Sequence, residues 1–398
     1  MKILQLCNKP PYPPVDGGTL AMNSITQGLL AEGCEVRVLS VCSDKHPVLH
    51  DQMTDEYLEK THFESQYVDL GVHVLGAFMA MMCGESYHVK RFESNDFALK
   101  LKRVLEEEDF DIVHLESVFL TPYVPIVRKY SSAKVVLRAH NVEHKIWRHV
   151  ANGTRNPFKA WYVKHLSLTL GAYEREHCND YDAIVSITPE DARFFKEAGC
   201  RKRIEAIPFA VNPEPLENVA VESDTLFHIG SMDWIPNQEG IRWFLDKVWP
   251  LVHAQTPQVK LYLAGRKMPQ DLMDLQVEGV QVVGEVSDAM YFIGSKQINV
   301  VPLLSGSGIR VKIIEAMSAG KTVISTTVGA AGINYTDGEN ILIADTPEQF
   351  ARQIRRCVED PDFCSRVGAS AYALIANEYS QEKLTKRLLD FYEKLTNR

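Results

Sequence analysis

Residues 301–324 read VPLLSGSGIRVKIIEAMSAGKTVI, and this segment decides the expected fold. Its first residues are apolar and β-branched, which predicts the end of a buried strand. Residues 305–308, Ser-Gly-Ser-Gly, lack the bulky side chains that would keep a ligand away from the backbone. Ile309, Ile313 and Met317 then recur with the spacing of a helix, and a glycine ends that helix before a second apolar run. The segment therefore predicts a strand–loop–helix–strand unit of a parallel sheet.

The small-residue loop is also the expected phosphate site. A loop that opens a helix presents backbone N–H groups and the positive end of the helix dipole, which suits a phosphate or pyrophosphate. We assign Gly306, Ser307 and Gly308 to this role. At 100° per residue, Lys312 and Glu315 lie about 60° apart on one helix face, so that the carboxylate could accept hydrogen bonds from ribose hydroxyls. A solvated ion pair on an ordinary βαβ helix is the alternative.

Composition excludes several classes of protein. The chain has 398 residues, 45% of them hydrophobic and 24% charged, which is typical of a globular protein with two domains. A net charge of −9 does not indicate a nucleic-acid binder. Eight cysteines are scattered without a C-x-x-C pair. The longest apolar run lies near 74–83 and is too short for a membrane-spanning helix. No signal-peptide pattern follows the amino terminus. We therefore expect a reduced, cytoplasmic protein.

Short apolar strands alternate with helical segments along the whole chain, which predicts parallel sheets covered by helices. In the first half the expected strands are residues 2–6, 35–41, 110–115, 134–139, 182–188 and 204–208. In the second half they are residues 225–230, 260–265, 280–284, 298–303, 322–326 and 341–344. The polar residues 43–65 are interpreted as an insertion.

This rhythm predicts an α/β protein with two Rossmann-like domains that face a cleft. We expect an amino-terminal domain over residues 1–212, a linker rich in proline and acidic residues over 213–224, and a second domain over 225–375. Residues 376–398 carry leucines at nearly heptad spacing and are expected to form a helix that returns to the first domain. Packing within the second domain is the alternative.

Three positions in the first half lie where doubly wound sheets bind ligands, at the carboxyl ends of strands. Gly17 and Gly18 follow the first strand, in a spacing that is not G-x-G-x-x-G. Glu116 and His140 each close an expected strand. We interpret His140 as a sugar contact or proton relay and Glu116 as an acceptor contact or base; ordinary strand-end side chains are the alternative.

Taken together, these segments resemble the retaining nucleotide-sugar glycosyltransferases of family 4, which have the GT-B fold. The resemblance rests on PPVDGGTLAMNSITQGLLAEGCEVRVLSV, RAHNVEH, FHIGSMDWIPNQEGIRWFLDKVWP and GSGIRVKIIEAMSAGKTVIST. It extends over essentially the whole chain and is strongest for the bacterial branch that builds cell-surface polysaccharides.

The resemblance implies roles for individual residues. Glu315 matches the second glutamate of the E-x7-E motif, which holds the donor ribose. The glycine pair 17–18 matches the loop that approaches the donor phosphates, and His140 matches a histidine near the transferred sugar. Gly284 and Val286 lie in a segment whose backbone contacts the nucleobase in the family.

Two departures from the family pattern stand out. Ser307 occupies the position of the first motif glutamate, so the carboxylate that the family places near the sugar is missing. The loop after Gly230, SMDWIPN, lacks the cation that the family supplies for phosphate binding. Arg310 and Lys312 are candidates to provide that charge, because both side chains bind phosphate well; solvated helix charges are the alternative.

The resemblance implies transfer of a sugar from a nucleoside diphosphate sugar to a glycan or lipid-linked acceptor, with retention of anomeric configuration. It implies no metal and no cofactor other than the donor substrate. A nucleotide-sugar epimerase or hydrolase of the same fold, or a non-catalytic nucleotide-sugar binder, remains open. The sequence H-N-V-E-H at 140–144 also spells an inverted zinc-peptidase motif, but it follows a strand instead of lying on one helix.

Membrane contact is a further hypothesis. Cationic and aromatic residues interleave between 148 and 165, and such a face suits an anionic bilayer on which lipid-linked acceptors lie. These are Arg148, His149, Arg155, Lys159, Trp161, Tyr162, Lys164 and His165. A solvated helix face is the alternative. The expected location is thus the cytoplasm, with peripheral contact at the inner face of the membrane.

Overall fold

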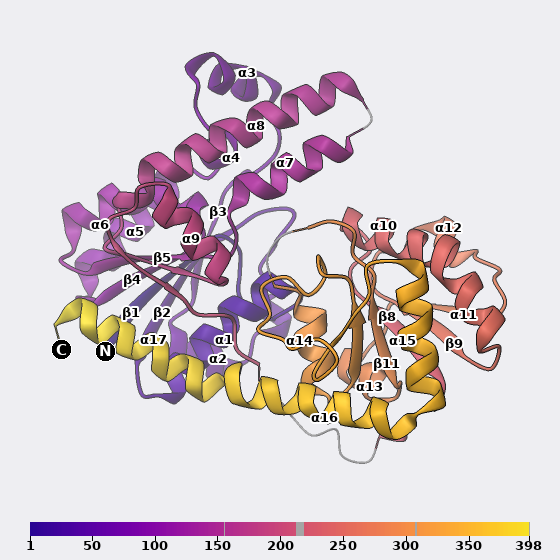
Figure 1. Cartoon of the computed structure of the whole chain (residues 1–398). Helices are drawn as coiled ribbons and strands as arrows, with labels where there is room; N and C mark the ends of the chain where they lie inside the picture. The colour runs from indigo at the N-terminus through magenta and orange to yellow at the C-terminus, as the bar shows by residue number, and fades with distance from the viewer. Residues whose placement is uncertain (155, 212–218, 307–308, 398) are drawn as a thin grey trace. The chain divides into compact units, whose positions relative to one another are not determined.

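The computed structural model describes residues 1–154, 156–211, 219–306 and 309–397 (Figure 1). The chain divides into two compact units, Met1–Ala210 with Gln381–Arg398, and Val211–Ser380. Half of the linker expected at 213–224 lies outside the described residues, as do Ser307, Gly308 and Arg155. Each unit is an α/β domain with an entirely parallel sheet.

The first unit contains a seven-stranded sheet in the order β3-β2-β1-β4-β5-β6-β7. Its strands are β1 Lys2–Cys7, β2 Glu35–Cys42, β3 Glu64–Tyr67, β4 Ile112–Glu116, β5 Lys134–Ala139, β6 Ala183–Ser186 and β7 Arg203–Ala206. Its longer helices are α1 Gly17–Ala31, α2 Asp55–Thr61, α3 Val74–Cys83, α5 Asn95–Glu107, α6 Val124–Tyr130, α7 Glu143–Gly153, α8 Pro157–Glu176, α9 Pro189–Glu197 and α17 Gln381–Thr396. Shorter turns of helix are η1 His50–Gln52, α4 Tyr87–Lys90, η2 Val118–Tyr123 and η3 His177–Asn179.

The second unit repeats this plan with a six-stranded sheet in the order β10-β9-β8-β11-β12-β13. Its strands are β8 Thr225–Ile229, β9 Lys260–Ala264, β10 Val280–Gly284, β11 Ile298–Val301, β12 Thr322–Ser325 and β13 Leu342–Ile343. Its helical elements are α10 Ile235–Trp243, η4 Phe244–Val248, α11 Trp249–Gln255, α12 Gln270–Met273, α13 Ala289–Gly294, α14 Val311–Ser318, α15 Pro347–Glu359 and α16 Pro361–Glu378. In both sheets the strand order reverses beside the first strand, between β1 and β4 and between β8 and β11.

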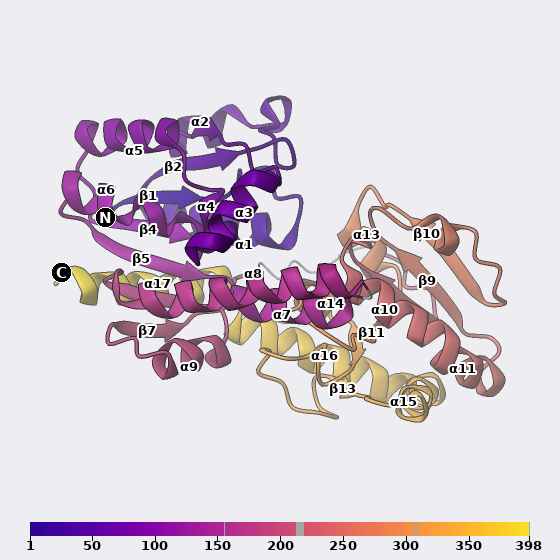
Figure 2. The same ribbon diagram turned by 90° about the horizontal axis from the view of Figure 1, so that it is seen from above.

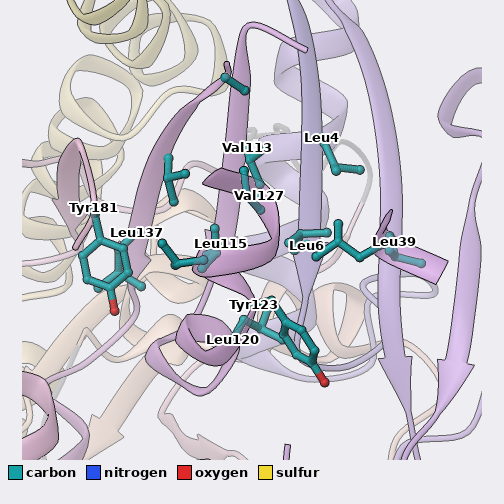
Figure 3. Packing of buried hydrophobic residues seen from close by; sticks show 14 of the residues in the cluster. Leu4, Leu6, Leu39, Val113, Leu115, Leu120, Tyr123, Val127, Leu137 and Tyr181 are labelled. Atoms are coloured by element: carbon teal, nitrogen blue, oxygen red, sulfur yellow. The ribbon is translucent and has the colours of Figure 1, made fainter. Parts of the chain in front are cut away.

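Alternation along β1 explains how one strand serves two cores. Leu4 and Leu6 belong to the cluster that α5 and α6 cover, shown in Figure 3, whereas Ile3 and Cys7 belong to the cluster beneath α1 and α17. Buried strands of a parallel sheet need apolar side chains on both faces, because helices cover both. The polar residue at the centre of this strand, Gln5, is therefore an exception that needs partners.

The terminal helix packs within the first unit, as the sequence predicted. Leu384, Leu388 and Phe391 of α17 join the apolar cluster that α1 contributes to (Figures 1 and 2). Gln381 fixes the start of the helix, because its amide accepts from Ser24 Oγ at 2.6 Å and donates to the Ser24 carbonyl at 2.6 Å.

Two expectations need correction. The polar segment 43–65 is not a simple insertion, because it contains α2 and ends in the edge strand β3, which pairs with β2. The helix of the decisive segment begins at Val311, not at Ile309, so that Arg310 stands at its N-cap position. Ile313 and Met317 are fully buried, as their spacing predicted.

The contact between α1 and α17 leaves no room for a side chain at Gly28. A Cβ atom there would overlap Thr385 Oγ1 and Gln381 Nε2. We expect Gly28→Ala to lower the free energy of unfolding by about 1–3 kcal/mol, because the added methyl forces the helices apart. Urea unfolding measures this change.

Gly76→Ala is the matched control, since the nearest heavy atom to its added Cβ would be 3.5 Å away. Alanine is the better helix former, so this variant should be unchanged or more stable by up to about 1 kcal/mol. Wild-type stability of Gly28→Ala would contradict the close packing of the two helices.

Candidate active site

Glu116 and His140 meet at the carboxyl edge of the first sheet. Glu116 is the last residue of β4, and His140 follows the neighbouring strand β5. Glu116 Oε2 lies 2.7 Å from His140 Nε2. The carboxylate is completely buried, whereas the imidazole keeps 16% of its side-chain surface exposed. Both residues are candidates from the sequence. In the structure Glu116 is buried in the sheet, and His140 lies between it and the surface.

The other oxygen of Glu116 is also occupied. Gln5 Nε2 donates to Oε1 at 2.7 Å, and His114 Nε2 lies 3.3 Å from the same atom. Burial alone would raise the pKa of Glu116, but His114 and His140 outweigh that effect and lower it below its usual value. Glu116 is therefore an ionised group that orients its neighbours.

The contacts around Glu116 extend to the terminal helix α17. Tyr392 of α17 contacts His114 Nδ1 through its hydroxyl. On the other side, Thr26 of α1 donates to Gln5 Oε1 at 2.6 Å, which directs the Gln5 amide nitrogen toward Glu116. The buried carboxylate is thus held by residues from both helices that cover this face of the sheet.

The first glycine-rich turn begins α1. Asp16 caps the helix by accepting from Thr19 N at 2.9 Å, and Lys9 Nζ lies 2.6 Å from the Asp16 carboxylate. Gly17 and Gly18 are the first two helical residues, and a Cβ atom on Gly18 would lie 3.1 Å from Lys9 Nζ, so the lysine side chain packs against the start of the helix. The turn lies beside the reversal between β1 and β4, where such sheets bind ligands.

Lys312 is the central cation of the second unit. Its Nζ donates to Asn237 Oδ1 at 2.6 Å and lies 3.2 Å from His228 Nε2. His228 Nδ1 donates to the Val300 carbonyl at 2.8 Å, which leaves Nε2 as the acceptor for the lysine. Burial, followed by the charge of Arg310, lowers the pKa of Lys312 to about 7.

The ammonium group of Lys312 lies beside the loop after Gly230, which lacks the cation that the family supplies there. A Cβ atom on Gly230 would lie only 2.6 Å from Lys312 Nζ. The lysine therefore brings a positive charge against the loop after β8, which has no cation in its own SMDWIPN sequence.

Arg310 supplies a second positive charge beside the small-residue loop. It is 5% exposed, and its guanidinium lies 5.2 Å from the centre of the Trp234 ring. Burial lowers its pKa to about 10, so the group stays charged at neutral pH. Gly306 has a φ angle of +128°, and a Cβ there would lie 2.6 Å from Arg310 Nη2. Only glycine allows this approach.

The remaining donor-site candidates lie on neighbouring elements. Glu315 follows Lys312 on α14; burial raises its pKa, and Lys312 opposes that shift. Gly284 ends β10 with a φ angle of +74° and accepts from Gly265 N at 2.7 Å, while Val286 is partly exposed two residues later. Arg310, Lys312 and Gly306 are thus brought together, and Gly284 and Val286 are on another strand end of the same sheet.

The H-N-V-E-H sequence does not place its histidines on one helix. His140 precedes α7, whereas His144 belongs to it and binds Glu174 Oε2 of α8 through Nδ1 at 2.6 Å. Glu143 lies near the same carboxylate, and burial together with Glu174 raises its pKa to about 8. These contacts join α7 to α8.

Several site residues were missed from sequence. Gln5, His114 and Arg138 are polar residues inside the apolar strands KILQLC, IVHLE and KVVLRA, and all three are at most 1% exposed. His228 interrupts TLFHI in the same way. A polar side chain within a strand that is buried on both faces is the signal that could have identified them.

Family models and solved structures place this geometry among known proteins. The model described as Glycosyltransferase Family 4 matches residues 15–215, and the model described as Glycosyl transferases group 1 matches residues 223–360. A Klebsiella pneumoniae protein, described as an uncharacterized 44.6 kDa protein in the cps region, is 23% identical over 96% of this chain and 97% of its own.

Solved glycosyltransferase structures share the fold at low sequence identity. Sucrose-phosphate synthase from Thermosynechococcus elongatus has a TM-score of 0.73 and 15% identity, with both chains covered completely. HepE from Anabaena in complex with UDP has a TM-score of 0.66 and 14% identity over 99% of this chain and 100% of its own. TarM from S. aureus in complex with Fondaparinux, alpha-GlcNAc-glycerol and UDP has a TM-score of 0.67 and 12% identity over 98% and 100%.

The two models together cover most of both units, and the likeness to solved structures extends over nearly the full length. The predicted fold class, two parallel-sheet α/β domains of the GT-B type, is confirmed. The chain belongs to the glycosyltransferase family that these models describe, and it has the GT-B fold.

Proposed function

We propose that this protein transfers a hexose from a nucleoside diphosphate sugar to a glycan or lipid-linked acceptor, with retention of anomeric configuration and without a metal. UDP is the first nucleotide to test, because the HepE and TarM structures hold UDP. The relative from the cps region supports an acceptor within surface-polysaccharide synthesis. The alternatives are epimerisation or hydrolysis of the donor, and binding without catalysis.

The placement of Lys312 is the observation that carries the proposal. Two of its three N–H groups have acceptors, Asn237 and His228, and the described residues offer none for the third. The amine lies at the carboxyl end of β8, beside the reversal in strand order. A diphosphate at this sheet edge would complete the coordination of the ammonium and restore its charge.

Stabilising the leaving group is the main chemical requirement. Negative charge grows on the β-phosphate as the glycosidic bond breaks, and cations fixed in advance lower that barrier. Arg310 and Lys312 supply two positive charges in a partly desolvated site, which is the role that a divalent metal plays in other transferases. Glu315 would hold the ribose hydroxyls, and the backbone at Gly284 and Val286 would contact the base.

His140 is proposed to act on the sugar. Because ionised Glu116 can only accept, His140 must donate Nε2–H to it, and its Nδ1 is then the acceptor. That atom can accept from a sugar hydroxyl or take up a proton while Glu116 stabilises the resulting imidazolium. Glu116, fully buried, is thus proposed as a positioning residue and not as the acceptor base.

Retention follows if the acceptor attacks from the face that the diphosphate leaves. The departing β-phosphate can then take the acceptor's proton, so no second carboxylate is needed as a nucleophile. Gly17 and Gly18 would let the donor phosphates approach the amino end of α1.

The first test is donor binding. We expect UDP to raise the midpoint of thermal unfolding, more than GDP or ADP does, and equally with and without EDTA. Glu315→Ala should weaken UDP binding about 10-fold or more, because hydrogen bonds to a charged group contribute about 1.5–3 kcal/mol each. Glu359→Ala, an exposed glutamate on α15, is the control that should bind normally. If no nucleotide shifts the midpoint, the donor site is wrong.

Affinity for UDP should also depend on pH through Lys312. Its pKa of about 7 in the free protein rises when phosphate binds, so binding takes up a proton. Above pH 7, where the terminal phosphate of UDP is already ionised, we expect affinity to fall by up to about 10-fold per pH unit. Calorimetry between pH 7 and 9 measures this slope.

Two substitutions separate the lysine from other titrating groups. Lys312→Arg should abolish the slope, since guanidinium stays charged. Lys312→Gln should bind weakly at every pH. A wild-type affinity that stays constant over this range would contradict proton uptake at Lys312.

Turnover tests His140 and Glu116. With the donor identified above, we expect His140→Ala to lower the rate of UDP release about 100-fold or more with unchanged donor affinity. Glu116→Gln should keep the packing but lose the fixed tautomer, giving a smaller loss and a shifted pH profile. His50→Gln, on an exposed turn, is the control.

The same assay addresses the alternative activities. Product of retained anomeric configuration, formed only when an acceptor is added, supports transfer. Donor turnover at the same rate without acceptor would indicate an epimerase or hydrolase instead.

A further inference from the structure

Helix α3 of the first unit buries its small side chains and exposes its large apolar ones, which is the reverse of an ordinary surface helix. Its sequence, VLGAFMAMMC, carries no charge. The two side chains it buries are the small ones, Ala77 and Ala80, which meet Tyr87 and Leu166. Its large side chains point outward: Leu75 is 73% exposed, Phe78 54%, Met79 59% and Met82 71%. Their spacing of i, i+3, i+4 and i+7 makes one continuous apolar face.

Helix α8 extends this apolar surface. Tyr162 and Leu166 of α8 lie against the buried side of α3 (Figure 1). Phe158 stands one turn before Tyr162 on the same helix face, beyond that contact, and is 85% exposed. Trp161 beside it is 62% exposed. Scattered exposed apolar residues are normal, but a continuous set on two adjoining helices marks an interaction surface.

The charge around this surface is strongly biased. Residues 144–173, which contain most of the α7–α8 hairpin, include five Lys and Arg residues and no Asp or Glu, although the whole chain carries a net charge of −9. Among these, Lys159 and Lys164 on α8 and Arg148 on α7 are exposed. The apolar face of α3 thus adjoins a hairpin in which residues 144–173 carry positive charge only.

This combination selects one kind of partner. A second copy of the chain, joined by two-fold symmetry, would place these positive charges against one another. A nucleic acid would match the charge but would leave the aliphatic side chains of α3 in water. An anionic bilayer satisfies both, because its headgroups attract lysine and arginine while its acyl boundary accepts Leu, Phe, Met and Trp.

We propose that α3 and the amino-terminal part of α8 form a membrane-docking surface, in which α3 lies in the plane of an anionic bilayer and Lys159 and Lys164 contact its headgroups. Among the described residues, no helix has the length and apolar character that a membrane span requires. This surface does not depend on the donor site or on the transfer reaction, and the two proposals can fail separately.

Vesicle flotation tests the proposal. The full chain should float with phosphatidylcholine–phosphatidylglycerol vesicles and much less with phosphatidylcholine alone, and raised salt should weaken binding. We expect the double variant Phe78→Ser/Met82→Ser to bind at least about 10-fold more weakly. Leu99→Ser, a 65% exposed leucine on α5, is the matched control and should bind as wild type.

Charge reversal provides the second arm. Lys159→Glu/Lys164→Glu should lower partitioning onto anionic vesicles at least about 10-fold, at roughly one kcal/mol for each basic residue removed and more for its reversal. Lys60→Glu/Lys247→Glu changes net charge equally at exposed sites elsewhere and should bind normally. Equal thermal unfolding of all variants confirms that they fold.

Three results would overturn the proposal. These are binding that ignores anionic lipid, wild-type flotation of the α3 variant, and sedimentation that shows a dimer disrupted by Phe78→Ser/Met82→Ser. The last result would assign the surface to a second copy of the chain.

Discussion

A parallel sheet brings the carboxyl ends of all its strands to one edge, and this constraint positions Glu116 and His140 in the first unit and the loop before α14 in the second. In each unit the strand order reverses beside the first strand, so the loops there diverge and leave the backbone accessible. Glu116 and His140 end neighbouring strands of the first sheet, and Lys312 reaches the corresponding edge of the second. Each unit therefore carries its own candidate residues at its own sheet edge: a histidine and a glutamate in the first, and cations in the second.

The two halves solve the problem of a buried charge differently. Glu116 accepts from the Gln5 amide, contacts His140 at 2.7 Å and has His114 3.3 Å away. The two histidines lower its pKa, so it stays ionised in the free protein. Lys312 is held by acceptors that carry no charge, His228 and Asn237, so that burial lowers its pKa toward neutrality. The first arrangement is complete without a ligand. In the second, the lysine has only neutral hydrogen-bond partners, and under the proposed function a phosphate would supply the missing negative charge.

Sequence periodicity predicted most of this fold, because the strands are apolar on both faces and are bounded by glycine and polar turns. It failed where an element lacks that pattern: β3, at the edge of the sheet, reads ESQY and was taken as part of an insertion.

The candidates at strand ends were identified because position alone singles them out. The other neighbours of Glu116, Gln5 and His114, were not identified. Gln5 and Tyr392, which contacts His114, are 387 positions apart along a chain of 398 residues, and only the packing of α17 brings them to one network. The apolar run at 74–83 was noticed, but its outward orientation depends on which helix covers it.

The two departures from the family motif are best understood as one rearrangement. The loop after β8 lacks the cation that the family pattern has there. Without a replacement, this sheet edge would have no positive charge to attract a diphosphate. Lys312 of α14 places its ammonium beside this loop, and a side chain at Gly230 would displace it, since an added Cβ would lie 2.6 Å from Lys312 Nζ. A carboxylate at position 307 would stand near both Arg310 and Lys312 in sequence and would compete with phosphate for them. Serine in place of the first motif glutamate therefore accords with cations that have moved onto the loop–helix junction: the same positive charge is kept for the donor, and the acid that would neutralise it is absent.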